Sequence, residues 1–119
     1  MKALRFCIFI LLASSCQKQR PPNVHVLTPA DGQQFQIGDT VRIKAELNDA
    51  DILLSEYLIV VSGSSYSDTI INYAGHIQQS SYTLSNYFVI QTADTFKIIV
   101  GVYGGSSIYK EQPVYIKGY

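Results

Sequence analysis

The side chains that could perform chemistry in this chain are few and widely spaced. Its two histidines, His25 and His76, have no cysteine, histidine or acidic residue at metal-binding spacing. Serines are numerous, but none lies in a Gly-x-Ser-x-Gly turn, and no glycine-rich loop leads into a helical pattern. We therefore predict no catalytic residue, no cofactor and no enzymatic activity.

The best candidate for a metal site is the segment Asn48-Asp49-Ala50-Asp51. Calcium takes about six to eight oxygen ligands, mostly carboxylates and carbonyls, and Asp49 and Asp51 could begin such a site. Asn and Asp also form turns through hydrogen bonds from their side chains to the backbone, which explains the segment well. We predict no bound metal and keep Asp49 and Asp51 as the candidate ligands.

The N-terminal segment has the pattern of a targeting sequence. Two basic residues precede a short apolar run at 6–12, and the small residues Ala13-Ser14-Ser15 lead to Cys16. The run is far shorter than the ~20 apolar residues that span a bilayer as a helix. A basic start, a short apolar run and small residues before a cleavage point are typical of secretory signal peptides. We predict that residues 1–15 are removed.

The segment Leu12-Ala13-Ser14-Ser15-Cys16 resembles the lipobox of bacterial lipoproteins. The resemblance implies that Cys16 carries a diacylglycerol and becomes the first residue of a mature protein anchored in a membrane. Ala13 departs from the family, which most often has leucine three residues before the cysteine. Gln17 follows the cysteine, whereas the family commonly has aspartate there in proteins retained at the inner membrane. The resemblance thus implies the outer membrane of a cell envelope, on its periplasmic or its surface side.

Removal of the signal segment changes the charge of the chain. Of nine basic residues, two lie in the signal segment and two, Lys18 and Arg20, in a predicted tether at 16–23. Five basic residues then face nine acidic ones, a formal charge of −4. Because nucleic acids bind to basic surfaces, we predict no nucleic-acid partner. With Cys16 acylated, the domain at 24–119 has no thiol for a disulfide or a metal.

The domain is predicted to consist of β-strands. Polar and apolar residues alternate without a break over 40–48, so that every second residue from Val41 to Leu47 points to one face. Residues 95–103 alternate in the same way. Such alternation is typical of half-buried antiparallel strands, and no segment shows the periodicity of an amphipathic helix.

Five further strands are predicted from apolar runs bounded by turn residues. They cover residues 24–27, 55–62, 68–73, 82–90 and 108–117. Loss of alternation after Leu84 predicts a bulge. Pro113 predicts an edge strand, because proline cannot donate to a β-ladder. Seven short strands in one domain predict an antiparallel β-sandwich.

The start of the domain is similar to that of bacterial immunoglobulin-like domains. The similarity lies in Val24-His25-Val26-Leu27-Thr28-Pro29-Ala30-Asp31-Gly32, in Phe35 and in Gly38-Asp39-Thr40-Val41-Arg42-Ile43-Lys44-Ala45. It implies an all-β, seven-stranded immunoglobulin-like sandwich. Small lipoprotein families of unknown function share it, so it implies a fold rather than an activity. The chain departs from the pattern in having no Trp, and in having Phe96 near the usual position of a corner tyrosine.

Tyrosines provide the candidate binding residues. All nine lie after Cys16, many beside serine, glycine or asparagine, a mixture typical of binding loops. If the strands alternate in direction, the loop at 62–67 lies at the end of the domain far from the tether. We therefore predict that Ser64, Ser65 and Tyr66 contact a partner, either an envelope protein or a glycan.

An alternative function remains open, that of a structural subunit in a larger envelope complex. Such a subunit would have an exposed apolar sheet face or a bare edge strand. The same strand directions would place the loops at 48–54, 74–81 and 104–107 toward the tether. A binding module would instead have exposed tyrosines on the far loops.

Overall fold

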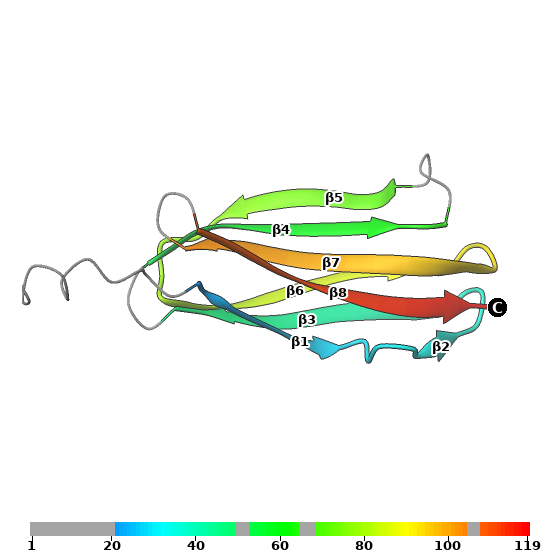
Figure 1. Cartoon of the computed structure of the whole chain (residues 1–119). Coiled ribbons are helices and arrows are strands. Elements are labelled where there is room, and N and C mark those ends of the chain that lie inside the picture. The colour runs from blue at the N-terminus through cyan, green and yellow to red at the C-terminus, as the bar shows by residue number, and fades with distance from the viewer. Residues whose placement is uncertain (1–20, 50–52, 65–68, 105–107) are drawn as a thin grey trace, which may run out of the picture.

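The computed structural model describes residues 21–49, 53–64, 69–104 and 108–119, which form eight β-strands and no helix (Figure 1). The predicted signal segment and Cys16 lie outside the described residues. Within the described part of the chain, no helix has the length and apolar character needed to cross a membrane. The strands are β1 (Asn23–Thr28), β2 (Gln34–Phe35), β3 (Thr40–Asn48), β4 (Leu54–Ser62), β5 (Thr69–His76), β6 (Ser81–Val89), β7 (Asp94–Gly104) and β8 (Ile108–Gly118).

The strands form two sheets that face each other as a sandwich (Figure 1). One sheet has the order β1-β3-β6 and the other the order β2-β8-β7-β4-β5. All pairs are antiparallel except β2 with β8, where Gln34 lies opposite Lys117 and Phe35 opposite Gly118. The predicted all-β, two-sheet architecture is confirmed. The predicted number of seven strands is wrong, because β2 has only two residues and is too short to produce an alternating pattern.

The core lies between the sheets and is formed by the alternating residues of the long strands. Buried residues of β3 run from Val41 to Leu47 at every second position, as predicted. Those of β7 include Phe96, which packs against Phe88 of β6 with 5.8 Å between ring centroids. From Tyr57 to Ser62, β4 alternates between buried and half-buried residues, as is typical of an inner strand, and it lies between β7 and β5.

The bulge predicted after Leu84 does not exist. β6 pairs with β3 in an unbroken register from Thr40 opposite Val89 to Asn48 opposite Ser81. The alternation is lost in the sequence because a polar residue, Asn86, occupies a half-buried inward position between two buried apolar ones. Pro113 pairs with Ile99 of β7, and β8 lies between β7 and the short β2 rather than at the edge of the sheet as predicted. Because β2 pairs only with Lys117 and Gly118, no described strand pairs with Pro113 on its other side.

The strand directions agree with those predicted. β1 begins opposite the end of β3, where Asn23 pairs with Asn48, and the last residues of β3, β5 and β7 lie at this end (Figure 1). The last residues of β4 and β6 lie at the opposite end, together with Tyr119. We call these the tether end and the far end of the domain.

Candidate functional site on the open side of the sandwich

The two long sides of the sandwich differ in how the sheets meet. On one side, which we call the closed side, β1 and β2 cover the edge of β8. The backbone N–H of Val26 donates to Oε1 of Gln112 at 3.2 Å, and the N–H of Tyr115 donates to Oδ1 of Asp31 at 2.8 Å. The N–H of Gly32 donates to the carbonyl oxygen of Tyr115 at 2.7 Å. The protein's own chain therefore occupies backbone groups of this edge at Tyr115, Lys117 and Tyr119.

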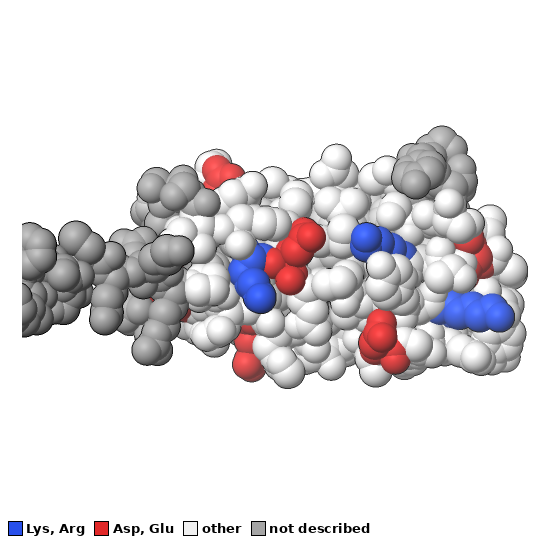
Figure 2. All heavy atoms as spheres, in the orientation of Figure 1, with Lys and Arg blue, Asp and Glu red and all other residues white. Residues whose placement is uncertain are grey.

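On the other side, which we call the open side, β5 and β6 are the edge strands. Among the described residues β5 pairs only with β4, and β6 pairs only with β3. The segment from Thr69 to Ala93, which contains both strands, has no Asp, Glu, Lys or Arg. In Figure 2 the charged side chains lie mostly over β7 and β8, and the rim at β5 is nearly white. Proteins commonly protect edge strands with charges or prolines, and this side has neither.

Among the described residues, no strand pairs with the outer edge of β5. The N–H of Ile77 donates to the carbonyl oxygen of Ser55 in β4 at 2.8 Å. Backbone groups point to opposite sides of a strand at alternate residues. The N–H and C=O groups of Asn72, Ala74 and His76 therefore point away from β4. A further strand could pair with them.

Near the tether end, three tyrosines fill the gap between the sheets on the open side. The ring of Tyr57 in β4 lies 5.4 Å from that of Tyr82 in β6 and 5.9 Å from that of Tyr73 in β5. Tyr57 is buried, and its ring occupies the place where a side chain at Gly75 would lie. Burial, together with hydrogen bonds to Tyr73 and Tyr82, raises the pKa of Tyr57, so its hydroxyl stays protonated and able to donate.

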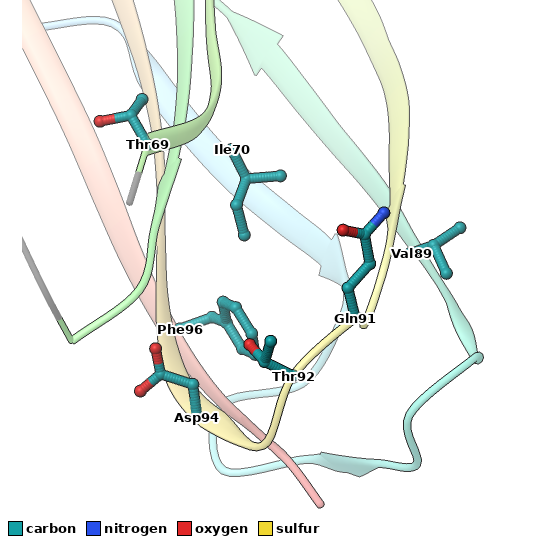
Figure 3. A pocket seen from close by; sticks show the side chains of 7 residues that line it. All are labelled: Thr69, Ile70, Val89, Gln91, Thr92, Asp94 and Phe96. Atoms are coloured by element: carbon teal, nitrogen blue, oxygen red, sulfur yellow. The ribbon is translucent and has the colours of Figure 1, made fainter. Parts of the chain in front are cut away.

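Toward the far end the open side is hollowed into a pocket of about 390 Å³ (Figure 3). Side chains of β5, β6, β7 and the turn before β7 line it: Thr69, Ile70, Val89, Gln91, Thr92, Asp94 and Phe96. Figure 3 shows Ile70 projecting toward Phe96, with the polar groups of Gln91, Thr92 and Asp94 around them. Hydroxyl, amide and carboxylate groups around an apolar floor could hold a small polar molecule.

Asp94 connects this pocket to the predicted contact loop. Its Oδ2 accepts a hydrogen bond from the backbone N–H of Ser64 at 3.1 Å, and its Oδ1 accepts one from the N–H of Thr95 at 2.7 Å. The Ser64 hydroxyl and these two N–H groups lower the pKa of Asp94, so its side chain is a carboxylate at neutral pH. Ser64 is exposed as predicted, whereas Ser65 and Tyr66 lie outside the described residues.

The metal candidates receive no support from the described residues. Asp49 is buried at 5 % exposure, and Asp51 lies outside the described residues. No three His, Cys, Asp or Glu side chains of the described ranges lie together as a metal site would require. His76 faces Glu56 with 3.6 Å between Nδ1 and Oε1, and both side chains are largely exposed to solvent. This pair is not buried.

Tyrosines with serine, glycine or asparagine neighbours lie on strands in the described residues, as the predicted strand ranges place them. Tyr73 and Tyr82 belong to the open side, and Tyr103 lies on the outer face of β7, 4.7 Å from the ring of Tyr109. The hydroxyl of Tyr109 donates to Oε2 of Glu111 at 2.8 Å. On the same outer face, a second hollow of about 480 Å³ lies beside Tyr115. Their serine and glycine neighbours therefore do not make them loop residues, and these tyrosines present their rings from strands.

No model of a known protein family matches the chain, and no curated protein shows significant similarity to it.

Proposed function

We propose that the protein is a lipid-anchored lipoprotein of the bacterial cell envelope, whose immunoglobulin-like domain binds another protein and performs no catalysis. The signal-like N-terminus and Cys16 support the anchor. The two-sheet fold supports a domain that presents strand edges and sheet faces. Binding through such surfaces needs no catalytic group, and no three His, Cys, Asp or Glu side chains of the described residues lie together.

The strand order supports the immunoglobulin-like assignment. Three consecutive neighbours, β1, β3 and β6, face the trio β8, β7 and β4, as strands A, B and E face G, F and C in immunoglobulin domains. Two features depart from that pattern. β5 pairs with β4 rather than with β6, and Phe96 stands at the corner where many such domains have tyrosine.

The open side is the observation that carries the binding function. Both of its edge strands lack charged residues, and Asn72, Ala74 and His76 direct backbone groups outward. Addition of a strand to a bare sheet edge is a common mode of protein recognition. This mode corresponds to the second of the two predicted functions, assembly with another protein.

Substitution at the predicted anchor tests the envelope assignment. A Cys16→Ser variant of the full chain, expressed in a bacterium that processes lipoproteins, should move from the membrane fraction to the soluble fraction. Cys7→Ser is the matched control, because Cys7 lies in the segment that is removed, and it should remain in the membrane fraction. Mass spectrometry of the wild-type protein should find an acylated N-terminal Cys16. Membrane retention of the Cys16→Ser variant would contradict the anchor.

Glycan binding at the far end is a second candidate function, which the composition of the pocket favours. Asp94, Gln91 and Thr92 offer acceptors and donors suited to sugar hydroxyl groups. Titration with soluble envelope saccharides should shift the NMR signals of Thr92 and Asp94. The Asp94→Ala variant should lose the shift, and a Lys110→Ala variant on β8 should keep it. Unchanged signals at saturating saccharide would exclude this candidate.

A further inference from the structure

We propose that β5 pairs with β5 of a second copy of this chain, antiparallel and around a two-fold axis. The two five-stranded sheets would then form one continuous sheet. This inference deepens the proposed function, because it names the partner of the open side. Edge pairing between identical chains gives a closed, self-complementary dimer.

The backbone of β5 fixes the register of this pairing. β5 has an irregularity at its start, where Ile71 pairs with Val61 but Thr69 pairs with Ser62, so Ile70 is an extra residue. The regular stretch therefore runs from Ile71 to Ile77, and its central residue is Ala74. A two-fold axis through Ala74 uses every outward backbone group of this stretch and forms about six hydrogen bonds between the copies.

The side chains agree with the same register. Residues directly opposite each other share a face of the sheet, so Asn72 would lie opposite His76 of the second copy on the outer face. Two alanines meet at the axis, where a small side chain avoids a clash. On the inner face, Tyr73 would lie opposite Gly75, next to the ring of Tyr57. Tyr73 is 52 % exposed in the single chain, and the pairing would cover it.

The lack of charge favours a second copy over an unrelated strand. A heterologous partner is commonly selected by complementary charges across the interface. The edge strand from Thr69 to His76 has no Asp, Glu, Lys or Arg that could select a partner by charge. Between identical strands the same lack of charge is favourable, since no like charges face each other across the axis.

The proposed anchor sets the orientation of the dimer. A two-fold axis perpendicular to the sheet places the two tether ends at opposite ends of the dimer. β7 has 11 residues and extends over ~36 Å, whereas the six residues at 17–22 between Cys16 and β1 reach at most ~21 Å. An upright domain could therefore attach only one copy to a given membrane. Both anchors reach one bilayer when the continuous sheet lies parallel to it.

Disulfide trapping tests the register. The Ala74→Cys change is made in the full chain with Cys7→Ser and Cys16→Ser, so that the introduced thiol is the only one. Opposed residues of a hydrogen-bonded pair have Cα atoms ~5.5 Å apart, within the range that a disulfide spans. Mild oxidation should convert most of the protein into a dimer on a non-reducing gel. Ser85→Cys, at an exposed position of the other edge strand β6, is the matched control and should stay monomeric.

Light scattering of the purified protein tests the pairing without a crosslink. Over a rising concentration series, the mass of the chain with Cys7→Ser and Cys16→Ser should double. Addition of Ala74→Lys places two ammonium groups at the axis and should abolish the doubling, whereas Ser85→Lys should leave it intact. A mass that stays monomeric at every concentration, or equal crosslinking by the Ser85→Cys variant, would overturn the proposal.

These outcomes are separable from the fate of the proposed anchor. If the wild-type protein is bound to membranes through Cys16 but the serine variants stay monomeric, only the β5 pairing is wrong. If the serine variants dimerise but Cys16→Ser remains in the membrane fraction, only the anchor is wrong.

Discussion

The closed and open sides of the sandwich join the same two sheets by different means. On the closed side, side-chain oxygens of Asp31 and Gln112 accept hydrogen bonds from backbone N–H groups of the neighbouring strand. On the open side, aromatic rings of Tyr57 and Tyr82 fill the space between the sheets, and in the described part of the chain no strand pairs with the outer edge of β5. The fold thus stabilises one edge with its own chain and leaves the other available to a partner.

The largest effect is expected at Tyr57, on which the open side depends. Truncation to alanine removes a buried ring that packs against two others and lies over Gly75. Loss of a buried aromatic side chain costs about 3–5 kcal/mol. The Tyr57→Ala variant should lose about that much free energy of unfolding, measured by urea denaturation.

Tyr57→Phe is the control for this change, because it keeps the ring and removes only the hydroxyl. Its expected loss is about 1 kcal/mol, the typical contribution of a hydrogen bond. If Tyr57→Ala cost no more than Tyr57→Phe, packing of the ring would not stabilise the open side.

A smaller effect is expected at Asp31 on the closed side. Asp31→Ala removes the acceptor that the N–H of Tyr115 uses at 2.8 Å. A hydrogen bond to a charged group contributes about 1.5–3 kcal/mol, and solvent exposure of this one favours the lower end. We expect a loss of about 1.5 kcal/mol in the free energy of unfolding.

Asp31→Asn tests whether the acceptor oxygen or the charge is responsible. It keeps an oxygen in the position of Oδ1 and should recover most of the lost stability. Equal destabilisation by Asn and Ala would show that the negative charge matters rather than the hydrogen bond.

The long strands of this domain and their buried faces can be predicted from its sequence to a large extent. The contacts that connect the two sheets along their sides cannot. The alternating runs in β3 and β7 specify their buried faces residue by residue. The pairing of β2 with β8 involves only Gln34 and Phe35, too few residues for a periodic signal. Contacts such as that between Asp31 and Tyr115 connect residues far apart in the sequence, and no local sequence pattern predicts them.

Gln112 provides a weaker test of the same side. Its Oε1 accepts from the N–H of Val26 at 3.2 Å, a neutral and partly buried hydrogen bond. Gln112→Ala should therefore cost about 1 kcal/mol in the free energy of unfolding. Gln112→Glu keeps an acceptor oxygen and should cost less. If both variants were as stable as the wild type, β1 would be held to β8 by packing alone.

The candidate site was less predictable than the fold. The sequence signal of the open side is an absence of charge, since the segment from Thr69 to Ala93 has no Asp, Glu, Lys or Arg. That signal is visible in the sequence, but it acquires a meaning only when topology places β5 and β6 at edges. The predicted loop at Ser64 does approach the far-end pocket, through its hydrogen bond to Asp94.

The smallest effect is expected at the far end of the open side, and it should appear as a dependence on pH. The hydrogen bonds from Ser64 and Thr95 lower the pKa of Asp94 below its ordinary value of 3.8. A carboxylate of this kind stabilises the folded state at pH values above its pKa in the unfolded chain. This contribution is lost as pH falls through the lower pKa that the group has in the folded state. The wild type should therefore be more stable than Asp94→Asn at neutral pH, and the difference in unfolding midpoint should shrink as pH falls past 3.8 and vanish below the lower pKa of the folded state. Ser64→Ala removes only the hydroxyl donor and should show a fraction of that difference over the same pH range. If the difference in unfolding midpoint between wild type and Asp94→Asn stayed constant into acid, the ionised form of Asp94 would not be what stabilises the domain.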